Sequence, residues 1–113
     1  MALPTIFLFT DFGNNGSYVG QTHAALAHAA PSITVIDLMA DAPRFDAKRS
    51  AYLLASLVDY LPVASIIIGV VDPGVGGDRA AIIVEADGRR YVGPDNGLFQ
   101  IVARRAAIAQ AWR

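Results

Sequence analysis

The chain has 113 residues, which is enough for one domain built around a single hydrophobic core. Its net charge of −1 excludes a strongly basic surface for nucleic acid or for an anionic membrane. The lack of cysteine excludes disulfide bonds, thiolate catalysis and cysteine-ligated zinc. Apolar residues make up 54% of the chain, so we expect either a sheet covered on both faces or an apolar surface that meets a partner.

The apolar start of the chain, residues 1–10, is too short to cross a membrane, which takes roughly 18 apolar residues. It also lacks the basic start and the small-residue cleavage site of a signal peptide, so it is typical of a buried strand. We therefore expect a cytoplasmic protein with no membrane partner.

The first part of the chain predicts strands alternating with helices. The apolar run Ile6–Phe9 predicts a buried strand that feeds a loop. Ser17 can cap a helix from about Tyr18 to Ala29, which Pro31 stops. The β-branched run Ile33–Leu38 predicts the second strand, with Asp37 near its end.

The middle of the chain continues the alternation. Asp46 can cap a helix from about Ala47 to Tyr60, which has one broad apolar side. The fully apolar run Ser65–Val71 is the strongest strand prediction, and a glycine-rich segment follows it.

The last part of the chain predicts a β-hairpin and a helix. Segments Ala80–Glu85 and Arg90–Val92 flank Asp87-Gly88, which is a good hairpin turn, and Gly97–Ala107 has helical spacing. The final segment Ala109–Arg113 has no cap or turn signal, so we expect the chain to be part of a longer protein.

This order of elements predicts an α/β fold with a mainly parallel central sheet flanked by helices and a local β-hairpin. The sequence contains no internal repeat, low-complexity tract or interdomain linker, so residues 1–113 are expected to form one domain.

Acidic residues follow or close the predicted strands. They are Asp11, Asp37, Asp72 and Asp95. Asp95 is part of the segment Gly93-Pro94-Asp95-Asn96-Gly97. In open α/β sheets, ligands bind beyond the carboxyl ends of the strands, so this pattern predicts a polar ligand site at one edge. Taken alone, Asp11 is as typical of a turn or a cap as of such a site, and Asp72 is as typical of a turn, while Asp95-Asn96-Gly97 is more typical of a turn that leads into a helix.

Two common kinds of site do not fit the sequence. His23 and His28 are five residues apart in a predicted helix, which misses the same-face spacing of a metal pair, so no metal is expected. The glycine-rich loop lacks the Lys and Ser/Thr of a phosphate loop, and it does not match the dinucleotide fingerprint. The residues by themselves therefore indicate a polar site whose ligand stays open.

Five sequence blocks together are more specific than any single residue. They are Thr10-Asp11-Phe12-Gly13, Tyr18-Val19-Gly20, Val70-Val71-Asp72-Pro73-Gly74-Val75-Gly76, Arg79 and Val92-Gly93-Pro94-Asp95-Asn96-Gly97. In this order and spacing they resemble the N-terminal part of the S-adenosyl-L-methionine hydrolases (hydroxide adenosyltransferases) of the fluorinase/chlorinase-like superfamily. The resemblance covers essentially the whole chain.

The resemblance implies binding of S-adenosylmethionine as the substrate, with no separate cofactor. Substitution at its ribose C5′ expels methionine, and the hydrolytic members use water, which gives adenosine and methionine. The resemblance also implies a homotrimer whose active site lies between the N-terminal domain of one subunit and the C-terminal domain of the next.

Two positions separate the branches of this family. The halogenases carry a Tyr where this chain has Asp72, and the fluorinase carries a Thr where it has Val75. A carboxylate would repel a halide, whereas it can orient a water and accept its proton. Asp72 and Arg79 match the first two members of the hydrolases' Asp-Arg-His set, so the resemblance implies that they are catalytic. A halogenase is the alternative, which Asp72 opposes.

The resemblance also implies substrate-binding residues. Asp11 matches the carboxylate that holds the ribose hydroxyls, and Phe45 occupies the place of an aromatic residue near the reacting carbon. Asp95 and Asn96 belong to a shared block and are expected to bind substrate.

The chain departs from the family pattern in three ways. Gly16 stands where many members have an Asp, and Ala40 stands where a His is expected. The family's C-terminal domain, with most of the adenine and methionine contacts, is missing from these 113 residues. A second alternative is therefore an inactive domain that binds ligand or forms a trimer.

Overall fold

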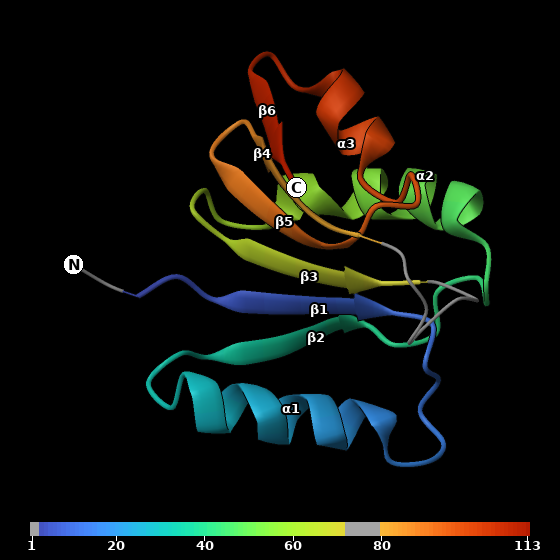
Figure 1. Ribbon diagram of the computed structural model, residues 1–113, viewed down its shortest axis with the longest axis vertical. Coiled ribbons are helices and arrows are strands. Elements are labelled where there is room, and N and C mark those ends of the chain that lie inside the picture. Colours follow the sequence, from blue (N-terminus) through green and yellow to red (C-terminus); the bar gives the residue numbers. More distant parts are fainter. Residues whose placement is uncertain (1–2, 72–79) are drawn as a thin grey trace.

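A computed structural model describes residues 3–71 and 80–113 of the chain, which form a six-stranded sheet with helices on both faces (Figure 1). The elements in chain order are β1 (Ile6–Thr10), α1 (Tyr18–Ala29), β2 (Val35–Met39), α2 (Ala47–Leu57), the 3-10 helix η1 (Val58–Tyr60), β3 (Ile66–Val70), β4 (Ala81–Ala86), β5 (Arg89–Pro94), α3 (Gln100–Arg105) and β6 (Ala109–Trp112).

The sheet is mixed, so the prediction of a mainly parallel sheet was only partly right. The strand order is β2-β1-β3-β5-β4-β6, and β2, β1, β3 and β5 run parallel. β4 is antiparallel to both of its neighbours, β5 and β6. The α/β class and the hairpin are confirmed, while β6 was not predicted.

The turn at Asp87-Gly88 explains why β4 runs antiparallel to β5. Both residues have positive φ, 49° and 84°, which is the conformation of a tight hairpin turn whose twist matches the strands. The Asp87 carboxylate also accepts hydrogen bonds from the backbone N–H groups of Ala107 and Ile108. The turn of one hairpin therefore holds the start of β6 beside β4.

The helix predictions were right in position and partly wrong at the ends. α1 has the predicted bounds, but the Ser17 side chain makes no cap hydrogen bond and instead contacts Gln21. The Asp46 side chain caps α2 by accepting from the backbone N–H of Arg49 at 2.9 Å, as predicted. The predicted helix over Ala47–Tyr60 ends as a 3-10 turn.

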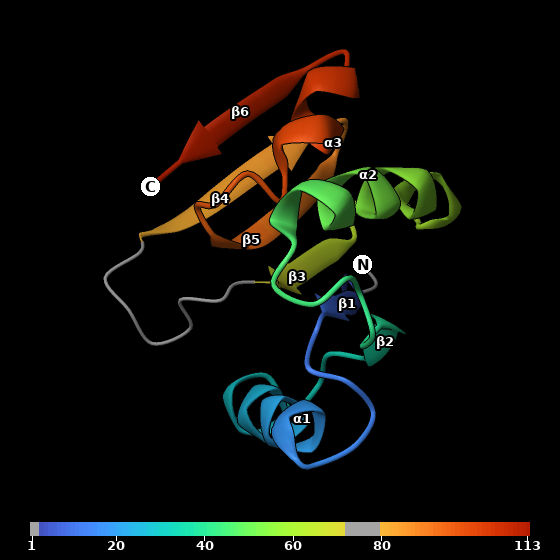
Figure 2. The ribbon, with the colours of Figure 1, turned by 90° about the vertical axis from the view of Figure 1, so that its right-hand side faces the viewer.

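The two faces of the sheet are covered unequally. Figure 2 shows α2 and α3 side by side on one face and α1 on the other. The main core lies under α2 and α3, where Phe9, Leu54, Ile67 and Leu98 have no exposed surface. α1 contributes no buried residue. Among the described residues, no helix has both the length and the apolar composition needed to cross a bilayer.

A pair of glycines lets β3 and β5 pack closely under α3. A Cβ atom on Gly93 would lie 2.1 Å from the carbonyl oxygen of Gly69, and one on Gly69 would lie 2.8 Å from Leu98 Cδ2. The close approach requires glycine at position 93, where the neighbouring atom is backbone, whereas at position 69 the side chains of Leu98 and Phe99 would have to move.

Candidate functional site

The carboxyl ends of three parallel strands come level at one edge of the sheet (Figure 1). Thr10 of β1 is paired with Val70 of β3. Ile68 is paired with Val92 of β5, so Val70 and Pro94, each two residues further on, are level too. The residues that follow β1 and β5, including Asp11 and Asp95, are therefore gathered at this edge, as the sequence predicted.

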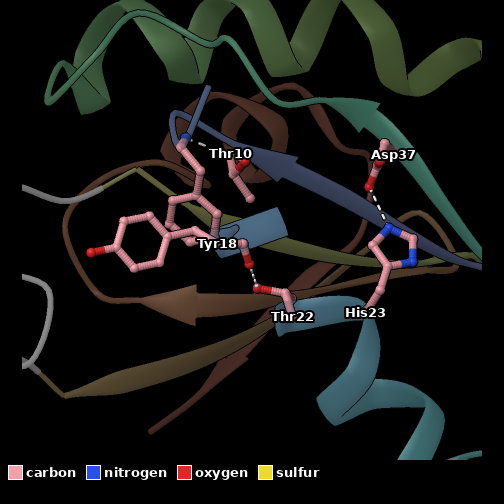
Figure 3. A network of polar contacts seen from close by, with 6 residues as sticks. Thr10, Tyr18, Thr22, His23 and Asp37 are labelled. Carbon is pink, nitrogen blue, oxygen red and sulfur yellow. Dashed lines mark hydrogen bonds and ion pairs between the residues drawn. The ribbon is translucent and has the colours of Figure 1, made fainter. Parts of the chain in front are cut away.

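Asp37 does not join this edge, and the expectation that it closes its strand was wrong. It lies inside β2, paired with Leu8. Its carboxylate Oδ1 lies 2.7 Å from Nε2 of His23 on α1, and Figure 3 shows the two side chains pointing toward each other. Both side chains are partly exposed. The pair therefore joins α1 to the sheet. The prediction for Asp37 failed because the position of a residue within a strand depends on how the strands pair, which the local sequence does not give.

Asp11 holds the loop that carries Phe45. Asp11 is buried, and its carboxylate Oδ2 accepts a hydrogen bond from the backbone N–H of Phe45 at 2.8 Å. Its own N–H donates to the carbonyl of Val70 at 3.3 Å, which extends the sheet by one residue. Two predicted substrate-binding residues, 34 positions apart in the chain, are thereby in direct contact.

Phe45 has an unusual backbone and an exposed ring. Its φ of 56° is in the left-handed region, which non-glycine residues rarely adopt. The ring is 55% exposed, and the Arg44 guanidinium lies 5.0 Å from its centroid. Such backbone strain is found preferentially at functional sites. The hydrogen bond to Asp11 stabilises this conformation and leaves an aromatic surface beside a carboxylate.

Asp95 and Asn96 make contacts within the fold. Asp95 Oδ2 lies 2.6 Å from Nε of Arg113. The Asn96 side-chain amide donates to the carbonyl of Val71 at 2.6 Å, and its oxygen accepts from the N–H of Leu98 at 3.2 Å. These bonds fit a turn that leads into α3, so substrate binding by either residue stays a prediction.

The predicted catalytic residues Asp72 and Arg79 lie outside the described residues, in the segment 72–79. The flanking residue Val71 is fully buried at the end of β3. Within 3–71 and 80–113, no group of three or more His, Asp or Glu side chains is arranged to hold a metal ion.

Tyr18 lies near the same edge, although the sequence suggested it only as part of a motif. Its ring packs on Phe12 with the centroids 5.9 Å apart, and the Phe12 N–H donates to the hydroxyl of Thr10 at the end of β1 at 3.5 Å (Figure 3). The side chain is exposed. Two exposed aromatic rings therefore lie near this edge: Tyr18 at the start of α1, and Phe45 in the loop that Asp11 holds.

Comparison with known proteins matches this arrangement to one family. Residues 6–113 match the family described as "SAM hydroxide adenosyltransferase N-terminal domain". The chain is 45% identical over 97 residues to the "(R)-S-adenosyl-L-methionine hydrolase" of Thermus thermophilus, and 36% identical over 111 residues to the protein of that name from Methanocaldococcus jannaschii. These alignments cover 85% and 94% of this chain.

Solved structures show the same fold. A conserved hypothetical protein from Thermus thermophilus superimposes with a TM-score of 0.81 at 36% identity, over 98% of this chain and 47% of its own. An uncharacterized conserved protein from Thermotoga maritima gives a TM-score of 0.85 at 30% identity, over 95% of this chain and 41% of its own.

The chain belongs to the SAM hydroxide adenosyltransferase family, with its match in the N-terminal domain of that family. It spans 37% of the length of the Thermus thermophilus hydrolase and 42% of that of the Methanocaldococcus jannaschii hydrolase.

Proposed function

We propose that residues 1–113 are the N-terminal substrate-binding part of an enzyme that hydrolyses S-adenosylmethionine to adenosine and L-methionine. The family match and the names of the relatives support the reaction. The observation that carries the proposal to this chain is the hydrogen bond from Phe45 N–H to Asp11. It ties the loop that carries an aromatic ring suited to the nucleoside to a carboxylate suited to the ribose hydroxyls.

In the proposed reaction, a water oxygen forms a bond to C5′ of the ribose while the bond from C5′ to the sulfonium sulfur breaks. The bonding electron pair goes to sulfur, which becomes the neutral thioether of methionine. The carboxylate of Asp72 orients the water and accepts its proton, and Arg79 holds that carboxylate in place. No cofactor is needed, because the positively charged sulfur is already a good leaving group.

The remaining site residues fix the substrate. The Asp11 carboxylate uses Oδ2 for Phe45 N–H, so Oδ1 is the oxygen proposed to accept from the vicinal ribose hydroxyls. This arrangement holds C5′ in line with the attacking water, which is the main way a binding residue can raise turnover. Asp95 and Asn96 are proposed to contact the substrate as well.

The assembly and location of the whole enzyme are also proposals. Relatives extend well beyond the matched part, so the adenine and methionine contacts are proposed to come from a C-terminal domain. We propose a cytoplasmic homotrimer with sites between subunits. Because its apolar content is high, a chain of these 113 residues alone is expected to associate as a trimer or to aggregate through an exposed apolar face. It is also expected to lack turnover, because the proposed adenine contacts lie outside it.

The reaction is tested by incubating the full-length enzyme with S-adenosylmethionine and excess chloride or fluoride, followed by chromatography of the products. Adenosine and methionine are expected. A halogenated adenosine as the main product would assign the protein to the halogenases instead.

Light scattering and the same activity assay on the 113-residue chain test its association and its turnover. Turnover at an enzymatic rate would show that residues 1–113 suffice.

A further inference from the structure

A cavity with an apolar floor and several polar side chains lies between α2 and α3, the two neighbouring helices in Figure 2. It has a volume of about 270 Å³ and an apolar floor made by Ala51 and Ile101, which are both buried. Its walls carry four longer side chains: Lys48, Tyr52, Gln100 and Arg104. Asn96 and Gly97, at its rim, are shared with the predicted substrate-binding block, whereas neither Asp11 nor Phe45 lines the cavity.

The charge around this cavity has one sign. α2 and α3 contain four of the nine Lys and Arg residues of the chain and no Asp or Glu, although the net charge of the whole chain is −1. No carboxylate lines the cavity. Within the described part of the chain, Lys48 and Arg104 make no ion pair, whereas the neighbouring Arg49 is paired with Asp46. The cavity therefore has two cations that face no anion among the described residues.

The remaining wall residues suit an anion as well. The Tyr52 hydroxyl and the Gln100 amide can each donate a hydrogen bond, and Asn96 at the rim is already bonded to Val71 and Leu98. Lys48 on α2 supplies an ammonium charge and Arg104 on α3 supplies a planar guanidinium, and together they suit an anion with several acceptor oxygens and more than one charge. A phosphate group has both properties.

We propose that the cavity between α2 and α3 binds the phosphate group of a small molecule, or free phosphate, between Lys48 and Arg104. The volume is at the lower end of small-molecule pockets, which favours a compact ligand over a nucleotide. Two helices that pack against each other position the cations, so the spacing is set by the fold. This site does not depend on the proposed hydrolase function.

The test is a titration of the 113-residue chain with inorganic phosphate at constant ionic strength, followed by isothermal calorimetry and by backbone NMR shifts. Saturable binding is expected, with the largest shifts around Lys48 and Gln100. Lys48→Gln and Arg104→Gln should each weaken phosphate binding by roughly tenfold, the lower end for hydrogen bonds to charged groups. Both side chains are exposed, so both variants are expected to fold, which circular dichroism checks.

Arg49→Gln is the matched control, since it removes a cation from the same helix that does not line the cavity. It should bind phosphate as the parent does. Shifts that grow linearly without saturation, or an equal loss in Arg49→Gln, would overturn the site. A parallel titration with glycerol 3-phosphate distinguishes a phosphate ester from free phosphate as the ligand. If glycerol 3-phosphate binds more tightly than inorganic phosphate, the ligand is a phosphate ester; if it binds more weakly, the ligand is free phosphate.

Discussion

The side-chain amide of Asn96 donates a hydrogen bond to the carbonyl of Val71 at 2.6 Å, across 25 positions of the chain. This bond joins the turn after β5 to the end of β3, directly before the predicted catalytic residue Asp72. Asn96→Ala should lower the free energy of unfolding by about 1–3 kcal/mol, because the fully buried Val71 loses a hydrogen-bond donor. Urea unfolding of the parent and the variant measures this loss of stability. Gln100→Ala, at an exposed position nearby, is the control and should change stability little.

The glycine pair Gly69 and Gly93 gives a sharper stability prediction. Gly93→Ala puts a Cβ atom 2.1 Å from a backbone carbonyl oxygen, which cannot move aside like a flexible side chain. The loss should be at least the roughly 1–3 kcal/mol of ordinary overpacking. Gly20→Ala is the matched control: it lies in α1 with no atom within 4 Å of the added methyl, and it should stabilise by up to about 1 kcal/mol. Equal effects of the two variants would contradict the close packing of β3 and β5.

Asp11 should show two separable effects in the full-length enzyme. Asp11→Ala leaves Phe45 N–H without its acceptor and should weaken nucleoside binding by roughly 1.5–3 kcal/mol. Asp11→Asn keeps an oxygen that can accept from Phe45 N–H, so its thermal stability should stay near that of the parent while nucleoside affinity still falls. Calorimetry with adenosine and with an analogue lacking both ribose hydroxyls measures this. If Asp11→Ala discriminates against the analogue as strongly as the parent, Asp11 does not bind the ribose.

Asp72 should affect the rate more than the affinity. If its carboxylate orients and deprotonates water, Asp72→Asn in the full-length enzyme should lower kcat by roughly 10²–10⁴, the usual size of a general acid–base contribution. KM should change much less. Steady-state kinetics with S-adenosylmethionine provide the measurement, and a kcat within a few-fold of the parent would assign Asp72 to turn structure.

Tyr91 predicts a loss of stability in alkali. Burial raises the pKa of Tyr91 to about 12 from 10, with nearby Arg89 acting in the opposite direction. Because the unfolded chain loses this proton first, the contribution to stability is complete below pH 10 and is lost as the pH rises toward 12. For one titrating group, the free energy of unfolding cannot change by more than about 1.4 kcal/mol per pH unit. Urea unfolding between pH 9 and 11 gives the free energy of unfolding against pH. Its slope should be shallower in Tyr91→Phe than in the parent, and an unchanged slope would contradict the assignment.

Several local features were predictable because neighbouring residues determine them. The Asp46 cap joins residues three positions apart, and the hairpin turn needs only that Asp87 and Gly88 adopt positive φ. Helix α1 kept its predicted bounds, since a cap position and a following proline mark its ends. The placement of Asp11 and Asp95 at the same edge of the sheet also followed, because parallel strands place their carboxyl ends at one edge.

Other features depended on which strands become neighbours. The sequence by itself determined the alternating elements, the family and the candidate acids at the strand ends. Only the tertiary structure decided that β6 pairs with β4, that Asp37 meets His23, and that Asp11 holds Phe45 N–H. Each of these contacts joins residues at least 14 positions apart. Their formation depends on strand order and register, which are set by the packing of the whole sheet and leave no periodic signal in a short stretch of sequence.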